Sequence, residues 1–82
     1  MPNRVLANVM PVANFRFYAE FNDFLLPERR FTEFAYGFLD VVTVKDRIDS
    51  FGVPHAEVDL ILVNGQSMDF ACPVHDGDRI SG

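Results

Sequence analysis

The chain has 82 residues, a net charge of −5 and 49% hydrophobic residues, and it contains nine Phe. So many Phe can supply the core of one small domain, because each buried Phe contributes about 1.5–3 kcal/mol. The acidic balance argues against direct binding of nucleic acid, and no apolar run approaches the ~20 residues that span a membrane. A single cysteine, Cys72, cannot form an internal disulfide, which favours the reducing cytoplasm.

The first 12 residues differ from the rest of the chain. They combine Arg4 with apolar residues, a faint likeness to a secretory leader, but Asn8 and Pro11 interrupt the apolar run. We therefore expect residues 1–12 to be a loose N-terminal leader that can be disordered. Residues 13–82 are expected to form the domain.

Two alternating segments predict the first two strands. In FRFYAEF, residues 15–21, apolar and polar residues alternate strictly, which is typical of a half-buried strand. Residues 22–30 contain turn residues and Pro27 and predict a long connection, in which Arg29 and Arg30 are interpreted as a solvated basic doublet. A second alternation over Thr32–Leu39 predicts the next strand.

A short helix is predicted after these strands. Thr43 is placed as its N-cap with Asp46 at the third helical position, and Gly52 stands where a left-handed residue ends a helix. The apolar residues recur at helical spacing and define one buried stripe: Val44, Ile48 and Phe51. We expect this stripe to pack on Phe15, Phe17 and Leu62, or on their partners in the opposite phase.

The last third of the chain predicts three strands. The apolar run that follows Asp59 ends in Asn64-Gly65, a strong hairpin signal, and Gln66–Phe70 is the return strand. A turn at Asp76-Gly77-Asp78 precedes a short strand at Arg79–Ser81. The order strand, strand, helix, strand, strand, strand predicts an α+β fold, a mixed sheet of about five strands with one helix on one face.

Few residues could carry catalysis. Cys72 and His75 are three residues apart and suggest two alternatives, half of a metal site or a nucleophile pair. The sequence has no paired CxxC or HxxxH spacing, so the signal for zinc is weak. A buried Cys beside a solvated turn His is the favoured interpretation, and turn chemistry accounts for Asp76 and Asp78. His55 is interpreted as a solvent-facing connector residue. We therefore assign no catalytic, cofactor-binding or metal-ligating residue and expect no enzyme activity.

The segments FRFYAEFNDFL, VKDRIDSFGVPHAEVDLILVNGQSMDF and HDGDRIS closely resemble one known module. It is the ubiquitin-like β-grasp domain that precedes a PIN-like ribonuclease domain with a zinc ribbon in the Mut-seven C-terminal ribonuclease family. The resemblance covers roughly residues 14–81. It implies a β-grasp fold and a non-catalytic interaction module, whose partner is a protein and whose native chain continues into the ribonuclease domain. The catalytic carboxylates and zinc-binding cysteines of that family lie outside these residues.

A more distant resemblance offers an alternative function. The sulfur-carrier proteins of thiamine and molybdopterin synthesis share the hairpin asparagine, here Asn64, and the DGD turn, here residues 76–78. Their working part is a flexible tail that ends in Gly-Gly, whose carboxylate is adenylated and converted to a thiocarboxylate. This chain departs from that pattern, because it ends in Ser81-Gly82.

The short last strand leads to a further expectation. In a β-grasp this strand lies in the middle of the sheet, parallel to the first, and ordinary strands have about five or six residues. We expect Gly82 to be a domain boundary and the native strand to continue. Backbone groups left unpaired beside the short strand would invite another chain, so self-association through this gap is a second expectation.

Overall fold

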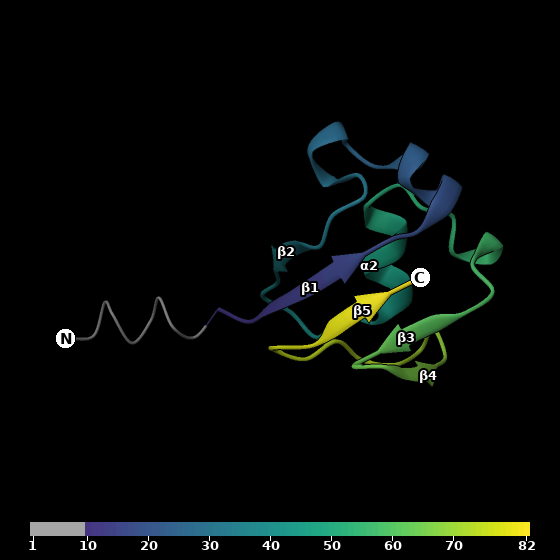
Figure 1. Ribbon diagram of the computed structural model, residues 1–82. Coiled ribbons are helices and arrows are strands. Elements are labelled where there is room, and N and C mark those ends of the chain that lie inside the picture. Colours follow the sequence, from purple (N-terminus) through teal and green to yellow (C-terminus); the bar gives the residue numbers. More distant parts are fainter. Residues whose placement is uncertain (1–9) are drawn as a thin grey trace.

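Five short strands form one mixed sheet in the computed structural model, which describes residues 10–82 (Figure 1). The sheet order is β2-β1-β5-β3-β4; β5 runs parallel to β1, and the other neighbouring pairs are antiparallel. The predicted α+β architecture, with the last strand central and parallel to the first, is confirmed. The strands are β1 (Val12–Arg16), β2 (Phe34–Gly37), β3 (Ile61–Val63), β4 (Gln66–Met68) and β5 (Arg79–Ser81).

The helix α2 (Val44–Ser50) begins at the predicted cap. The Asp46 N–H donates to Thr43 Oγ1 and the Thr43 N–H donates to an Asp46 carboxylate oxygen, each at 3.2 Å, which is a complete capping box. These hydrogen bonds from Thr43 hold the pKa of Asp46 below its ordinary value of 3.8. The helix ends at Ser50, and Gly52 follows as the predicted left-handed residue, with a φ of 91° that is readily adopted only by glycine.

Aromatic packing joins α2 to one face of the sheet. The ring of Phe51 meets the ring of Phe15 edge-on at 4.9 Å and that of Phe34 at 5.2 Å. Val44 and Ile48 are fully buried in the same core, so the predicted stripe is confirmed. The expectation for β3 holds only in the opposite phase. Leu62 is half-buried and faces away from α2, whereas the core positions of that strand are Ile61 and Val63.

The first strand differs from the sequence-based prediction. β1 begins at Val12, three residues before the predicted start, and ends at Arg16, so it shares only residues 15 and 16 with the predicted strand. Residues 19–24 form a 3-10 helix, η1 (Ala19–Phe24), in place of its second half. Ala19 has a φ of 51°, which turns the chain away from the sheet. The side chain of Asn22 holds this turn, because its Nδ2 donates to the carbonyls of Phe17 and Ala19 at 3.1 and 3.0 Å. Alternation alone therefore overestimated the strand.

Other segments are also shorter than predicted. The long connection contains a second 3-10 helix, η2 (Pro27–Arg29), and a third, η3 (His55–Glu57), lies between α2 and β3. The predicted strand over residues 32–39 is paired only over β2. The predicted return strand over residues 66–70 is paired only over β4, because a turn follows in which Asp69 Oδ1 accepts the Ala71 N–H at 2.9 Å.

The two ends of the domain bear on the expected boundaries. Residues 1–9 of the expected leader lie outside the described part of the chain. Met10 and Pro11 precede β1, whose first residue is Val12. At the other end, Gly82 continues the ladder beyond β5. Its N–H donates to the Arg16 carbonyl at 3.1 Å, and its carbonyl accepts the Tyr18 N–H at 3.0 Å. We expected β1 to keep unpaired backbone groups beside the short β5, and this is wrong. The chain leaves the sheet for η1 at the point where its pairing with Gly82 ends.

Candidate interaction surface

The face of the sheet opposite α2 is open to solvent. Side chains alternate along β1, so Ala13 and Phe15 are buried while Asn14 and Arg16 point outward. The parallel register places Asn14 beside Arg79 and Arg16 beside Ser81. Polar side chains from the two central strands therefore lie together on one surface.

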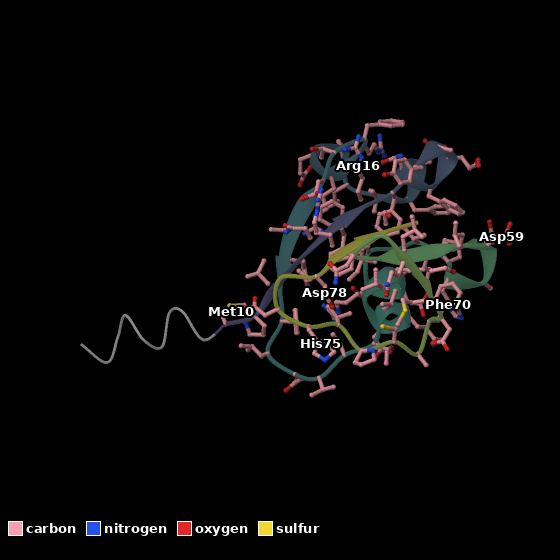
Figure 2. The ribbon with its side chains drawn as sticks, turned by 60° about the horizontal axis from the view of Figure 1, so that its bottom comes forward. Met10, Arg16, Asp59, Phe70, His75 and Asp78 are labelled. Carbon is pink, nitrogen blue, oxygen red and sulfur yellow. The ribbon has the colours of Figure 1, made fainter. Side chains whose placement is uncertain are left out.

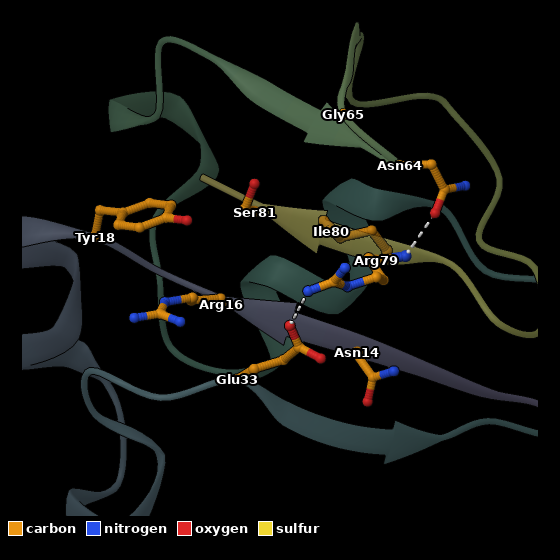
Figure 3. A pocket seen from close by; sticks show the side chains of 9 residues that line it. All are labelled: Asn14, Arg16, Tyr18, Glu33, Asn64, Gly65, Arg79, Ile80 and Ser81. Carbon is orange, nitrogen blue, oxygen red and sulfur yellow. Dashed lines mark hydrogen bonds and ion pairs between the residues drawn. The ribbon is translucent and has the colours of Figure 1, made fainter.

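These side chains line a shallow depression of about 460 Å³, here called the sheet-face cleft (Figure 3). Its rim comes from the segment before β2 and from the β3–β4 hairpin as well as from β1 and β5. Because four segments that are distant in the sequence contribute, the cleft exists only in the folded domain. The lining residues are Asn14, Arg16, Tyr18, Glu33, Asn64, Gly65, Arg79, Ile80 and Ser81.

An ion pair crosses the sheet-face cleft. Arg79 donates from Nη2 to Glu33 Oε1 at 2.9 Å, and this hydrogen bond raises the pKa of the guanidinium above its ordinary value. The Arg79 side chain is nevertheless 71% exposed, so solvent screens the pair. Arg16 lies with its guanidinium carbon 5.7 Å from the centre of the Tyr18 ring. The cleft thus presents two arginines and one tyrosine to a partner.

The hairpin asparagine positions the upper edge of the sheet-face cleft. Asn64 has a φ of 53° and Gly65 a φ of 83°, the conformation that a tight two-residue hairpin requires. The Asn64 N–H donates to the Arg79 carbonyl at 2.8 Å, and its Oδ1 accepts the Arg79 N–H at 2.9 Å. Its Nδ2 donates to the buried carboxylate of Asp78 at 2.9 Å. These bonds fix the hairpin against β5 and hold the start of β5 in register.

A second depression lies where β5 ends. This end groove, of about 480 Å³, runs between η1 and η3 beside residue 82, and Figure 1 shows both helical turns near the end marked C. Its walls combine apolar and acidic residues. The lining residues are Tyr18, Glu20, Phe21, Glu57, Val58, Asp59, Leu60, Leu62, Ser81 and Gly82.

Among the sequence-based catalytic candidates, His75 and Asp78 are close, with 3.8 Å between His75 Nδ1 and Asp78 Oδ2, but Cys72 forms no hydrogen bond with either of them. Cys72 is half-buried, with its Sγ 3.5 Å from the Pro73 carbonyl, and the His75 side chain is 72% exposed. Asp76 Oδ1 accepts the Val12 N–H at 2.8 Å, and Asp78 accepts the His75 N–H at 2.8 Å. Both carboxylates thus serve the turn and its attachment to β1, as the turn interpretation predicts. Within residues 10–82, no three His, Cys, Asp or Glu side chains are placed to hold a metal ion together.

Two interpretations of basic or titratable residues held only in part. His55 lies in the connector and its side chain is 33% exposed, but its Nδ1 lies 2.9 Å from Asp49 Oδ1 and its ring packs edge-on against Phe70 at 5.5 Å. This contact lowers the pKa of Asp49 below its ordinary value. The solvated doublet holds for the exposed Arg30, whereas Arg29 is half-buried and its guanidinium lies over three rings at 5.1–5.6 Å, those of Phe34, Tyr36 and Phe51.

Some functional positions were missed by sequence reasoning. From the sequence, Asn22 was interpreted as a residue that interrupts the strand pattern. In the structure it is fully buried, and its Oδ1 accepts the Phe31 N–H at 2.6 Å. The end groove also had no signal, because Glu20 is separated by dozens of residues from the other two carboxylates, Glu57 and Asp59. The one available hint was the Asn22-Asp23 pair, because Asn and Asp side chains often hydrogen-bond to nearby backbone groups.

Comparisons with known proteins agree with this architecture. A family model described as Mut7-C ubiquitin matches residues 10–82. Among solved structures, small archaeal modifier protein 1 of H. volcanii is similar over 87% of this chain and 93% of its own, at 16% identity and a TM-score of 0.62. At that identity the likeness shows the fold alone. No curated protein matches the chain. The ubiquitin-like β-grasp expected from the resemblance is confirmed.

Proposed function

The chain belongs to the Mut7-C ubiquitin family, and on that premise we propose that it is a non-catalytic interaction module whose sheet-face cleft binds a protein partner. The observation that carries this proposal is the open polar face opposite α2, where Arg16, Tyr18 and Arg79 lie exposed above a backbone that is already paired. Tyr and Arg are enriched among the residues that dominate binding at protein interfaces.

The partner proposed is a PIN-like ribonuclease domain that follows this module in the native chain. The resemblance of residues 14–81 to the accessory domain of such ribonucleases supports this choice. The net charge of −5 supports a protein contact over direct nucleic-acid binding. A cytoplasmic location belongs to the same proposal and is supported by the single Cys72. No helix in residues 10–82 is long and apolar enough to cross a membrane.

The module itself is proposed to lack enzyme activity. The candidate residues Cys72 and His75 have separate structural surroundings, and the carboxylates of the 76–78 turn are engaged in holding that turn. The proposal is tested with the 82-residue chain in nuclease assays containing magnesium, manganese or zinc. Turnover equal to that of buffer is expected. Turnover that copurifies with the folded chain would contradict it.

The sulfur-carrier alternative is supported by Asn64 and the DGD turn of residues 76–78, whose side chains are engaged in holding the hairpin and β5 together. The working group of a carrier is the carboxylate of a mobile tail, and the function is tested at Gly82. Incubation with ATP and an adenylating partner enzyme, followed by mass spectrometry, is expected to leave Gly82 unmodified. An acyl-adenylate or thiocarboxylate at Gly82 would instead establish the carrier function.

The proposed contact can be tested with the ribonuclease domain prepared separately. The isotope-labelled chain is titrated with that domain, and chemical-shift changes are expected to centre on Arg16, Arg79 and their neighbours. Arg79→Ala is expected to weaken the affinity roughly tenfold or more, in the range of interface hot spots. Lys45→Ala, on the exposed side of α2, is the matched control, because Lys45 makes only a surface ion pair at 3.6 Å. Shift changes centred on α2, or equal effects of the two variants, would contradict the proposed surface.

A further inference from the structure

The end groove has apolar walls that remain exposed. Tyr18 and Leu60 are 53% and 55% exposed on its two sides, and the outward-facing Leu62 of β3 lies between them. The buried side chain of Val58 contributes to the floor. Exposed apolar side chains gathered in a depression are characteristic of a binding surface, whereas apolar residues scattered singly are ordinary.

The charged residues of the end groove all have the same sign. Glu20, Glu57 and Asp59 line it, and no Lys or Arg does. Across residues 10–82, none of these three carboxylates forms an ion pair or a side-chain hydrogen bond, unlike Glu33, which Arg79 neutralises. Figure 2 shows the carboxylate of Asp59 at the outer edge of the molecule, well separated from Arg16. The negative charge of the groove is therefore available to a partner.

We propose that the end groove binds a peptide segment of a protein partner in which Lys or Arg side chains flank apolar ones. The apolar side chains would pack against Tyr18, Leu60 and Leu62, and the basic side chains would face the carboxylates of the rim. The inference rests on the proposed function as an interaction module and names a second contact for it, next to the sheet-face cleft, with which the groove shares Tyr18 and Ser81. Complementary charge raises the association rate and selects against acidic partners.

Other occupants fit the groove less well. Like charge disfavours nucleic acid and an anionic lipid surface. The three carboxylates do not form a cation site within the described residues. A second copy of this chain carries the same net charge of −5, so electrostatic repulsion opposes it. A basic and apolar peptide satisfies both the walls and the rim.

The probe is a short synthetic peptide in which lysine and leucine alternate. Two matched peptides serve as comparisons, one with glutamate in place of lysine and one with serine in place of leucine. Titration into the isotope-labelled chain is expected to shift, with the first peptide, the amides of Phe21, Glu57 and Leu60, which line the end groove but not the sheet-face cleft. The glutamate peptide is expected not to bind, the serine peptide to bind more weakly, and about 1 M salt to weaken binding strongly, because the Debye length is then about 3 Å.

Variants separate charge from fold. The double variant Glu57→Gln, Asp59→Asn is expected to weaken binding of the lysine–leucine peptide several-fold to roughly tenfold, which matches the loss of two exposed charge pairs. Asp40→Asn removes one negative charge, where the double variant removes two, at an exposed site outside the groove, and it is expected to bind normally. Leu60→Ser tests the apolar wall and is also expected to weaken binding. An unchanged amide spectrum elsewhere shows that each variant is folded.

Several results would overturn the proposal. They are equal binding of the glutamate peptide, shift changes outside the groove, an equal effect of Asp40→Asn, or absence of binding by every peptide. Groove amides that shift with protein concentration alone would show that a second copy occupies it. Failure here is distinguishable from failure of the proposed function, because titration with the ribonuclease domain and Arg79→Ala tests the sheet-face cleft independently.

Discussion

Asn64 and Asp78 stand fourteen residues apart and are joined by a hydrogen bond of 2.9 Å from Asn64 Nδ2 to Asp78 Oδ1. The other oxygen of the same carboxylate accepts the His75 N–H at 2.8 Å, and Asn64 Oδ1 accepts the Arg79 N–H at 2.9 Å. One pair of side chains thus connects the β3–β4 hairpin to the turn before β5. Asp78 is only 8% exposed, so these groups have little access to water.

Removing either member of this pair is expected to destabilise the domain. Asp78→Ala leaves the Asn64 amide and the His75 N–H without their acceptor, and the free energy of unfolding should fall by about 1–3 kcal/mol. Asn64→Gly keeps the backbone conformation of the turn but removes the side-chain hydrogen bonds. Urea titration of the two single variants and of the double variant should show that their losses in the free energy of unfolding do not add. Asp40→Ala, at an exposed position, is the control. An additive cycle would show that the pair is not coupled.

Asn22 is expected to be as important as a core residue. Asn22→Ala removes the acceptor of the Phe31 N–H and the donor to two carbonyls, all within a buried turn. The free energy of unfolding is expected to fall by at least about 2 kcal/mol, because the remaining groups lose their partners. Hydrogen exchange should show a newly unprotected Phe31 amide. The exposed neighbour in η1, Asp23→Ala, is expected to change little, and equal losses in the two variants would refute this role.

The aromatic core provides a test of the strand phase. Phe17 is 2% exposed and packs near the rings of Phe34 and Phe51 at 6.4 and 6.3 Å. Phe17→Ala is expected to lower the free energy of unfolding by about 3–5 kcal/mol through lost burial and a cavity. Phe31→Ala removes the same ring at a position that is 68% exposed and should change stability by no more than about 0.5 kcal/mol. Thermal unfolding followed by circular dichroism compares them, and an unshifted Phe17→Ala transition would be inconsistent with this core.

Stability at acidic pH should depend on the capping box of α2. The pKa of Asp46 is lower in the folded chain than its ordinary value of 3.8, because Thr43 hydrogen-bonds the ionised carboxylate. A lowered folded-state pKa gives stability that is fully present above the unfolded-state value and is lost as the pH falls through the folded-state value. The native chain should therefore exceed Asp46→Asn in stability near pH 7, with the difference narrowing below about pH 4.

The measurement is the urea midpoint of the native chain and of Asp46→Asn between about pH 2 and pH 7. Thr43→Ala should lower the free energy of unfolding by about 1 kcal/mol near neutral pH and remove most of the effect of Asp46→Asn. A difference between the native chain and Asp46→Asn that is constant over the whole pH range would contradict the assigned role of the ionised carboxylate.

Local chemistry made much of the fold predictable. The cap at Thr43, the left-handed Gly52 and the Asn64-Gly65 turn are each decided by one or two residues, and all three occur where the sequence places them. Alternation found β1 only in part: the strand begins at Val12, before the predicted start, and the buried hydrogen bonds of Asn22 override the periodicity after Phe17. For the candidate site, the sequence indicated the hairpin asparagine and the DGD turn but neither depression.

The sequence by itself therefore determined the element order, the helix boundaries and the hairpin, because propensities, caps and turn conformations act over a few neighbouring residues. Only the tertiary structure decided which polar residues share a surface. Arg79 meets Glu33 forty-six residues away, and the parallel pairing of β1 with β5 places Arg16 beside Ser81. The end groove likewise exists because η1, η3 and β5 converge, which no local pattern encodes. Register and crossover depend on the packing of the whole core, and they position both binding surfaces.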